Sequence, residues 1–224
     1  MFRKLFVPLT LAAAGIGFFV FSAVSMAADD PKLAFKSYAV QITRSVDPTP
    51  IPATPTATPV PVDHGPIVSV ALASANISAA SLVEQRDTEI KAGREYFQDP
   101  THPSLIAWYP RFGRPQDRAS NSIVAAHLDY VNFGPGPFAG ILSARVDDAL
   151  HVTMQDGTVF TYSVKSVAVI QLANLNMDAV VFPGLDSQTA RVTLISCGGT
   201  FVPFPGGGGE YLSRVILVAD RFVP

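Results

Sequence analysis

Short apolar runs separated by glycine and proline dominate residues 67–224, and they limit what this part of the chain can fold into. Gly and Pro interrupt the chain at residues 110, 115, 134–137 and 203–209, so we expect no long helix. About eight short strands without long helices predict an all-β fold, either a closed barrel or a sandwich. The runs expected to form strands are residues 68–72, 77–83, 105–109, 122–127, 150–154, 158–170, 191–196 and 211–222.

Two connecting segments carry further signals. Asp156 and Gly157 stand between two strand-like runs, and an Asp-Gly pair suits the turns that join antiparallel strands. We therefore expect a hairpin there. Residues 84–98 hold the densest charge in this part of the chain, and we interpret them as a turn of helix or a surface loop.

The N-terminus reads as an export signal or a membrane anchor. Arg3 and Lys4 precede an uncharged run over residues 5–28, which ends at Asp29 and Asp30. About 20 apolar residues are enough to cross a bilayer as a helix, whereas the apolar region of a secretory signal is about 7–15 residues. The length favours an uncleaved anchor, although the small residues at 25–28 leave cleavage and secretion as the alternative. The positive-inside rule places everything after Asp29 outside the cytoplasm.

Proline marks the segment between this N-terminus and the strands. Seven prolines fall within residues 47–66. Each fixes φ and lacks a donor, which favours extended polyproline II. Such a stretch would span roughly 60 Å as a semi-rigid spacer, and a plain disordered linker is the alternative. We therefore divide the chain into a signal or anchor segment (1–30), an extended Pro/Thr-rich linker (31–66) and a folded domain (67–224).

Composition excludes several classes of function. The net charge is −2 and no block of Lys and Arg occurs, so nucleic-acid binding is not expected. Four histidines and one cysteine form no close cluster, so we expect no metal site and no cofactor. His64, His102 and His151 are interpreted as solvated, and Trp108 as a core residue. A single cysteine rules out an internal disulfide, so Cys197 is either a small buried hydrophobe or a reactive thiol.

Three strand-like patterns carry chemically active side chains. One apolar run ends at His127, a second ends at Cys197, and Arg214 interrupts a third. Strand ends hold side chains rigidly while leaving them open to substrate. The glycines after Cys197 let a peptide backbone approach the thiol. An arginine within an apolar run needs a partner for its charge, which could be Asp129, Glu210 or a bound substrate.

These patterns resemble the sortase family over residues 67–224, in the order His, Cys, Arg. The matching segments are Ala125-Ala126-His127, Thr193-Leu194-Ile195-Ser196-Cys197, Arg214, Trp108-Tyr109-Pro110, Asn121-Ser122-Ile123-Val124, Gly134-Pro135-Gly136-Pro137-Phe138 and Tyr211-Leu212. Two small departures are Ala126 before the histidine, where Gly is usual, and Ser196 before the cysteine, where Thr is usual. The pattern resembles members of classes E and F.

The resemblance implies a closed eight-stranded barrel with short helices or turns, preceded by a hydrophobic N-terminal segment. It implies a membrane-bound cysteine transpeptidase with its catalytic domain outside the cytoplasm. Cys197 would cleave an LPxTG-like sorting signal of secreted proteins between Thr and Gly, with His127 as acid and base. The acyl group would pass to an amine of peptidoglycan or of a pilin lysine.

The resemblance also assigns supporting groups around these residues. Arg214 would hold substrate carbonyls and the oxyanion, with help from Ser196 and Gly198. The loop over residues 172–189 would grip the sorting signal, and residues 198–210 would form either a lid or a disordered loop. Two other functions stay open at this point. The domain could bind a peptide or wall polymer without catalysis, or it could be a cysteine peptidase that releases product to water.

Overall fold

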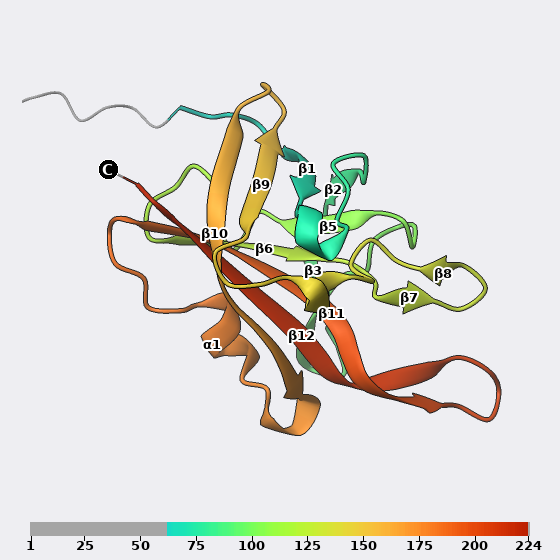
Figure 1. The fold of residues 1–224 in the computed structure, drawn as a ribbon. Helices are drawn as coiled ribbons and strands as arrows, with labels where there is room; N and C mark the ends of the chain where they lie inside the picture. The colour runs from blue at the N-terminus through green and yellow to red at the C-terminus, as the bar shows by residue number, and fades with distance from the viewer. Residues whose placement is uncertain (1–61, 224) are drawn as a thin grey trace, which may run out of the picture. The chain divides into compact units, whose positions relative to one another are not determined.

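The computed structural model describes residues 62–223 (Figure 1). One sheet of eight strands runs in the order β1-β9-β10-β12-β11-β6-β5-β2, and two small sheets, β3-β4 and β7-β8, lie outside it. The strands are β1 Ile67–Ala71, β2 Val83–Gln85, β3 Thr88–Lys91, β4 Arg94–Phe97, β5 Ile106–Tyr109, β6 Ser120–Ala125, β7 Asp129–Tyr130, β8 Gly134–Pro135, β9 Ala149–Met154, β10 Val159–Gln171, β11 Thr189–Pro203 and β12 Gly209–Phe222. The helices are η1 Ala73–Ala75, η2 Ile141–Ser143, η3 Leu172–Asn174 and α1 Met177–Val181.

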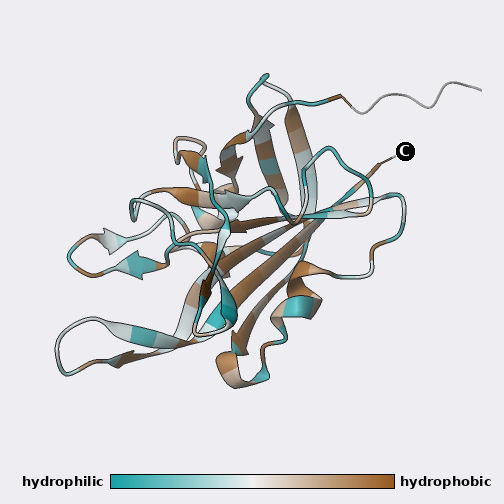
Figure 2. Cartoon of the chain, turned by 180° about the vertical axis from the view of Figure 1, so that it is seen from behind, coloured by the Kyte–Doolittle hydropathy of each residue, from teal (hydrophilic) through white to brown (hydrophobic). Residues whose placement is uncertain are grey.

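The large sheet curls into a nearly closed barrel, which confirms the predicted fold class. Its first and last strands meet at a single bridge between Ser69 and Leu82, next to β2. Alternate residues of the strands point inward and form the main core, which includes Val124, Leu194 and Val215. The long strands β11 and β12 are hydrophobic through their middle portions, where they cross the sheet (Figure 2).

Most neighbouring strands are antiparallel, but two pairs are parallel. β11 runs parallel to β6, and β2 runs parallel to β5. The parallel pair β6–β11 matters for the site, because the carboxyl ends of both strands lie at the same edge of the sheet. In Figure 1 these strands lie at the centre, with β12 on the other side of β11.

Most predicted strands are confirmed. Three predictions need correction, one for a strand and two for connecting segments. The predicted strand 77–83 is wrong for most of its length, because Ser78 Oγ accepts a hydrogen bond from Ala80 N at 3.1 Å and the chain bends there. Only Ile77 and Leu82, as isolated bridge partners of Leu72 and Ser69, and Val83, at the start of β2, take part in β-structure.

The interpretation of residues 84–98 as a helical turn or loop is also wrong. β3 and β4 form a hairpin. Its two turn residues, Ala92 and Gly93, have φ values of 50° and 75°, which is the left-handed geometry of a two-residue hairpin turn. Alanine is an unusual residue for that conformation, so the turn gave no signal in the sequence.

The third correction concerns residues 198–210, which are not a disordered loop; their role as a lid stays a prediction. β11 continues to Pro203 and β12 begins at Gly209, so the two strands extend together as a hairpin beyond the barrel (Figure 1). The turn closes through a hydrogen bond from Phe204 N to Gly208 O at 3.1 Å. By contrast, the hairpin predicted at Asp156-Gly157 is confirmed between β9 and β10.

The predicted anchor (1–30) lies outside the described residues, and so does most of the linker (31–66). Within residues 62–223 no helix is long and apolar enough to span a bilayer.

Candidate active site

The parallel pairing of β6 and β11 brings His127 level with Cys197. Their register couples Ala190 with Ser120 and continues in step to Ile195 with Ala125. Ala126 N then donates to Ile195 O at 3.2 Å, which carries the pairing one residue further. Cys197 and His127 each follow the last register pair by two residues, so they lie at the same edge of the sheet. Neighbouring strands are about 4.8 Å apart.

β12 places Arg214 on the other side of the cysteine. In the antiparallel pairing of β11 and β12, Cys197 and Arg214 are direct partners. Directly opposed residues point to the same face of a sheet. Cys197 and Arg214 therefore share one face on neighbouring strands, and His127 follows the end of β6 on the other side of β11. We call these three residues, in the order His127, Cys197, Arg214, the row.

This row lies on the outer face of the barrel and not in its interior. Ile195 and Ile216 stand two residues before Cys197 and two after Arg214, and both belong to a second apolar cluster outside the main core. Successive residues of a strand alternate between faces, so the thiol and the guanidinium share that outer face. Cys197 is half-buried and its thiol is free. The sulfur is therefore open to a ligand.

A cavity of about 540 Å³ opens over the row. One wall is the β3–β4 hairpin with the chain that follows it, and the other is the segment from Leu172 to Phe182 that contains α1. Both walls are partly apolar. The lining residues include Thr88, Glu95, Phe97, Asp99, Tyr109, Phe112, His127, Leu175, Met177, Asp178, Val181, Phe182, Cys197 and Arg214. The cavity therefore combines a free thiol with a partly apolar lining.

Burial raises the pKa of the Cys197 thiol, and the nearby carboxylates of Asp99, Asp129 and Glu210 raise it further. The Arg214 guanidinium acts in the opposite direction and lowers this pKa. The net effect is a rise in the pKa, which favours the protonated thiol over the thiolate. Formation of the thiolate therefore requires a base that can accept the proton.

Backbone contacts hold His127 in its place. Phe138 N donates to the carbonyl of His127 at 3.1 Å. Gly136 packs so closely against that carbonyl that a Cβ at this position would clash with it. The ring of Tyr130 meets the imidazole edge to face, with the two ring centroids 5.0 Å apart.

Arg214 pairs with neither of the carboxylates considered from the sequence. Its Nη1 donates to the carbonyls of Tyr211 at 3.1 Å and Ser213 at 3.0 Å. Asp129 instead accepts a hydrogen bond from the hydroxyl of Tyr211. Within residues 62–223 no carboxylate oxygen lies within 4.0 Å of a nitrogen of Arg214. A positive charge therefore faces the cavity without an acidic partner from the described part of the chain.

Ser196 and Gly198 flank the cysteine but face the barrel side of the strand. The Ser196 hydroxyl is buried and donates to the carbonyl of Ala126 at 2.9 Å. A Cβ at Gly198 would lie 2.6 Å from a methyl carbon of Val215. The hydroxyl of Ser196 thus binds the residue before His127. At Ser196 and Gly198, only backbone groups can face the cavity.

Asn121 supports a wall of the cavity, a role that the sequence analysis did not assign to it. It is 4% exposed. Its Nδ2 donates to Val180 O at 2.9 Å and to Val181 O at 3.1 Å, and its Oδ1 accepts from Thr193 Oγ1 at 2.8 Å. It therefore ties the end of α1, a wall of the cavity, to the two parallel strands. The sequence signals were a polar residue at the start of an apolar strand and its place in a segment that resembles the family pattern.

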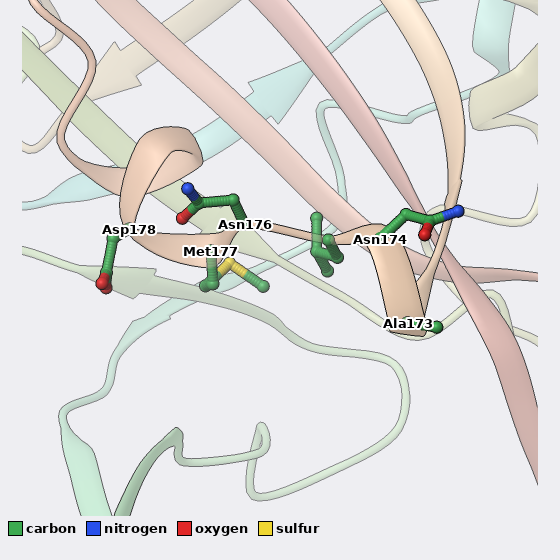
Figure 3. A pocket seen from close by; sticks show the side chains of 6 residues that line it. Ala173, Asn174, Asn176, Met177 and Asp178 are labelled. Carbon is green, nitrogen blue, oxygen red and sulfur yellow. The ribbon is translucent and has the colours of Figure 1, made fainter.

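The remaining histidines lie apart from the cavity. His64 pairs with Asp156 at 2.7 Å, His102 is exposed, and His151 contacts Thr161 at the surface. Trp108 is 1% exposed, as expected of a core residue. Among residues 62–223 no three metal-binding side chains come together. A second hollow of about 500 Å³ is lined by residues 173–178 alone and contains no nucleophile (Figure 3).

Fold and site together define a β-barrel protein with a thiol, an imidazole and a guanidinium in one open row. Comparison with known families agrees with this class: residues 83–222 match the Sortase domain family. That match covers more than half of the chain, and the chain belongs to the sortase family.

Solved structures of similar fold are sortases at low sequence identity. They include sortase A from Corynebacterium diphtheriae, with 15% identity, a TM-score of 0.48 and coverage of 71% of this chain and 62% of that one. Sortase C from Clostridium perfringens SM101 has 14% identity and a TM-score of 0.46, and 73% of each chain is covered. Sortase C1 from Streptococcus agalactiae has 14% identity, a TM-score of 0.45 and coverage of 69% of this chain and 66% of that one.

This chain thus spans about three fifths of the length of the Corynebacterium enzyme. No curated protein sequence matches it. Membership of class E or F is not tested by these comparisons and stays a prediction.

Proposed function

We propose that this protein is a cysteine transpeptidase that cleaves an LPxTG-like sorting signal and transfers the acyl group to an amine. One observation carries the proposal: Cys197 and Arg214 are direct partners on neighbouring strands, His127 follows the adjacent strand β6, and all three line one open cavity. Each side chain has a distinct task in acyl transfer, and the order of the row places the nucleophile between the base and the cation.

The first step uses Cys197 and His127. His127 accepts the thiol proton as the sulfur attacks the carbonyl carbon of the Thr–Gly bond. As the tetrahedral intermediate collapses, the C–N bond breaks and the imidazolium returns the proton to the leaving amine. A thioester remains on Cys197. The raised pKa of the thiol fits this step, because a thiol that is not already ionised needs a base at the moment of attack.

In the second step an amine attacks the thioester. His127 takes the proton of the incoming amine, a new amide forms, and the sulfur departs and regains a proton. We infer that this amine belongs to peptidoglycan or to a pilin lysine. If water entered instead, the same steps would give hydrolysis, and the enzyme would act as a peptidase.

Arg214 would stabilise the negative charge on the substrate oxygen in both steps. Its guanidinium makes hydrogen bonds to two backbone carbonyls, and no carboxylate of the described chain neutralises it. A preorganised cation in a partly buried site stabilises a developing oxyanion more than water does. Backbone N–H groups beside Ser196 and Gly198 are candidates for additional donors.

The cavity walls favour a peptide with apolar side chains. Phe97, Phe112 and Phe182 form a chain of ring contacts, with centroids 5.5 Å apart for the first pair and 5.6 Å for the second. Such a surface suits the Leu and Pro of an LPxTG-like signal. We also propose that the N-terminal run anchors the protein in the cell membrane with this domain outside, so that it meets exported substrates.

The test uses the full chain, an LPxTG-like peptide and an amine such as triglycine. We expect release of the C-terminal fragment and formation of the amide product. Cys197→Ala should abolish both, and Arg214→Lys should lower kcat/KM by about two orders of magnitude. Unchanged turnover in Cys197→Ala would disprove the proposal, and hydrolysis without amide product would make the protein a peptidase.

A further inference from the structure

Tyr211 contacts the segments that hold all three residues of the row. It precedes Arg214 by three positions on β12, and its carbonyl accepts a hydrogen bond from Arg214 Nη1 at 3.1 Å. Its ring packs on Phe201 of β11, four residues after Cys197, with ring centroids 5.0 Å apart. Its hydroxyl donates to Asp129 Oδ2 at 2.6 Å, two residues after His127.

Asp129 belongs to the segment 127–138, whose two ends are joined by backbone hydrogen bonds. Gly136 N donates to Leu128 O at 2.8 Å, Phe138 N donates to His127 O at 3.1 Å, and β7 pairs with β8. Residues 127–138 therefore form one small unit with His127 at its base. The hydrogen bond from Tyr211 to Asp129 therefore holds this unit in place relative to β12.

Two side-chain hydrogen bonds consequently bracket the histidine. On one side, the hydroxyl of Ser196, adjacent to Cys197, binds the carbonyl of Ala126 at 2.9 Å. On the other side, the Tyr211 hydroxyl binds Asp129. The inner bond orients the end of β6, and the outer bond orients the unit that follows it.

We propose that Tyr211 is a positioning residue for the reaction, holding His127 at the distance from Cys197 that proton transfer requires. This inference rests on the proposed function. The pair suits the role because the hydrogen bond to Asp129 raises the pKa of Tyr211 to about 12. The phenol therefore remains a donor throughout the neutral range.

The role differs from a contribution to folding. Asp129 is exposed and Tyr211 only half-buried, so water can replace the bond in a variant at little loss of stability. Proton transfer is more demanding, because a misplacement of about 1 Å at a reacting group can lower the rate up to a hundredfold. Removing the hydroxyl alone should therefore affect the rate more than the stability.

The experiment compares Tyr211→Phe with the unaltered full chain. We expect kcat to fall about tenfold while KM and the thermal midpoint change little. Hydrogen exchange of residues 127–138, followed by mass spectrometry, should become faster because the outer bond is lost. This second measurement needs no turnover.

Variants of the partner identify the bond itself. Asp129→Ala should reproduce the loss of kcat, and its combination with Tyr211→Phe should cost no more than either change alone. Asp129→Asn retains an oxygen acceptor and should restore most of kcat. Thr161→Val, which removes an exposed side-chain hydrogen bond to His151 on the far strands, is the matched control and should change nothing.

Three results overturn the inference: kcat of Tyr211→Phe within twofold of the unaltered chain, additive losses in the double variant, or unchanged exchange over residues 127–138. None of them affects the proposed function, which depends on Cys197→Ala. Conversely, a chain without any turnover would refute the transpeptidase proposal, and the exchange measurement would still decide whether Tyr211 fixes the segment around His127.

Discussion

Replacement of Asn121 by alanine should loosen a wall of the cavity and lower the free energy of unfolding by about 3 kcal/mol. The change removes three hydrogen bonds, two to carbonyls at the end of α1 and one from Thr193. Thr193 is 0% exposed, so its hydroxyl would lose its partner inside the protein. A buried polar group without a partner costs about 1–3 kcal/mol.

The bond to the Val180 carbonyl is part-buried, so water can replace it at a smaller cost, whereas the bond to the Val181 carbonyl is buried. We therefore expect a total loss of about 3 kcal/mol in the free energy of unfolding. Domains are typically stable by about 5–15 kcal/mol, so the variant should still fold. With a urea m-value of about 2 kcal/mol/M, the midpoint of unfolding should fall by about 1.5 M.

Urea unfolding and steady-state kinetics together test this prediction. Because α1 forms a wall of the cavity but carries none of the three catalytic candidates, KM for the peptide should rise several-fold while kcat changes less. Asn174→Ala, in the same segment but exposed, is the control and should match the unaltered chain in both assays. A shift in stability below about 1 kcal/mol would show that water replaces the amide and would refute the reasoning.

Two further predictions concern the thiol and the strand that follows it. Alkylation of Cys197 by iodoacetamide, measured against pH, should show a thiol pKa above its ordinary value. Removing the guanidinium in Arg214→Gln should move the profile to higher pH, removing the charge in Asp129→Asn should move it to lower pH, and the reverse order would contradict the assignment. Gly199 has φ of 77°, and a Cβ there would lie 2.5 Å from Ser213 Oγ. Gly199→Ala should therefore lower the free energy of unfolding by about 1–3 kcal/mol, measured in urea, and an unchanged midpoint would show that the strand can relax.

The strand content could be predicted from the sequence because the signals are local. The runs at 150–154 and 158–170 lie on either side of Asp156-Gly157, so their antiparallel pairing follows from the turn. The chemically active residues were found the same way, as polar side chains at the ends of apolar runs or within them.

Long-range pairing carries no comparable signal. The sequence does not show that β6 and β11 are parallel neighbours, because about 60 residues separate them and no turn fixes their register. The contacts of Asn121 could not be predicted for the same reason: its partners Val180 and Val181 belong to a distant segment. The turn at Ala92 was missed because a residue with a Cβ rarely adopts its left-handed conformation.

The two kinds of strand pairing explain how the positions of the thiol and the guanidinium can stay fixed while the cavity walls change. Parallel pairing brings His127 beside Cys197 after equal numbers of residues, and antiparallel pairing brings Arg214 to the other side. The spacing of Cys197 and Arg214 is thus set by the sheet, at about 4.8 Å between strands, whereas His127 lies two residues past β6 and also depends on the segment that follows it. The cavity walls come from different parts of the chain, the β3–β4 hairpin and the segment around α1. If the proposed function holds, substitutions in those walls can change which peptide binds without moving the thiol relative to the guanidinium.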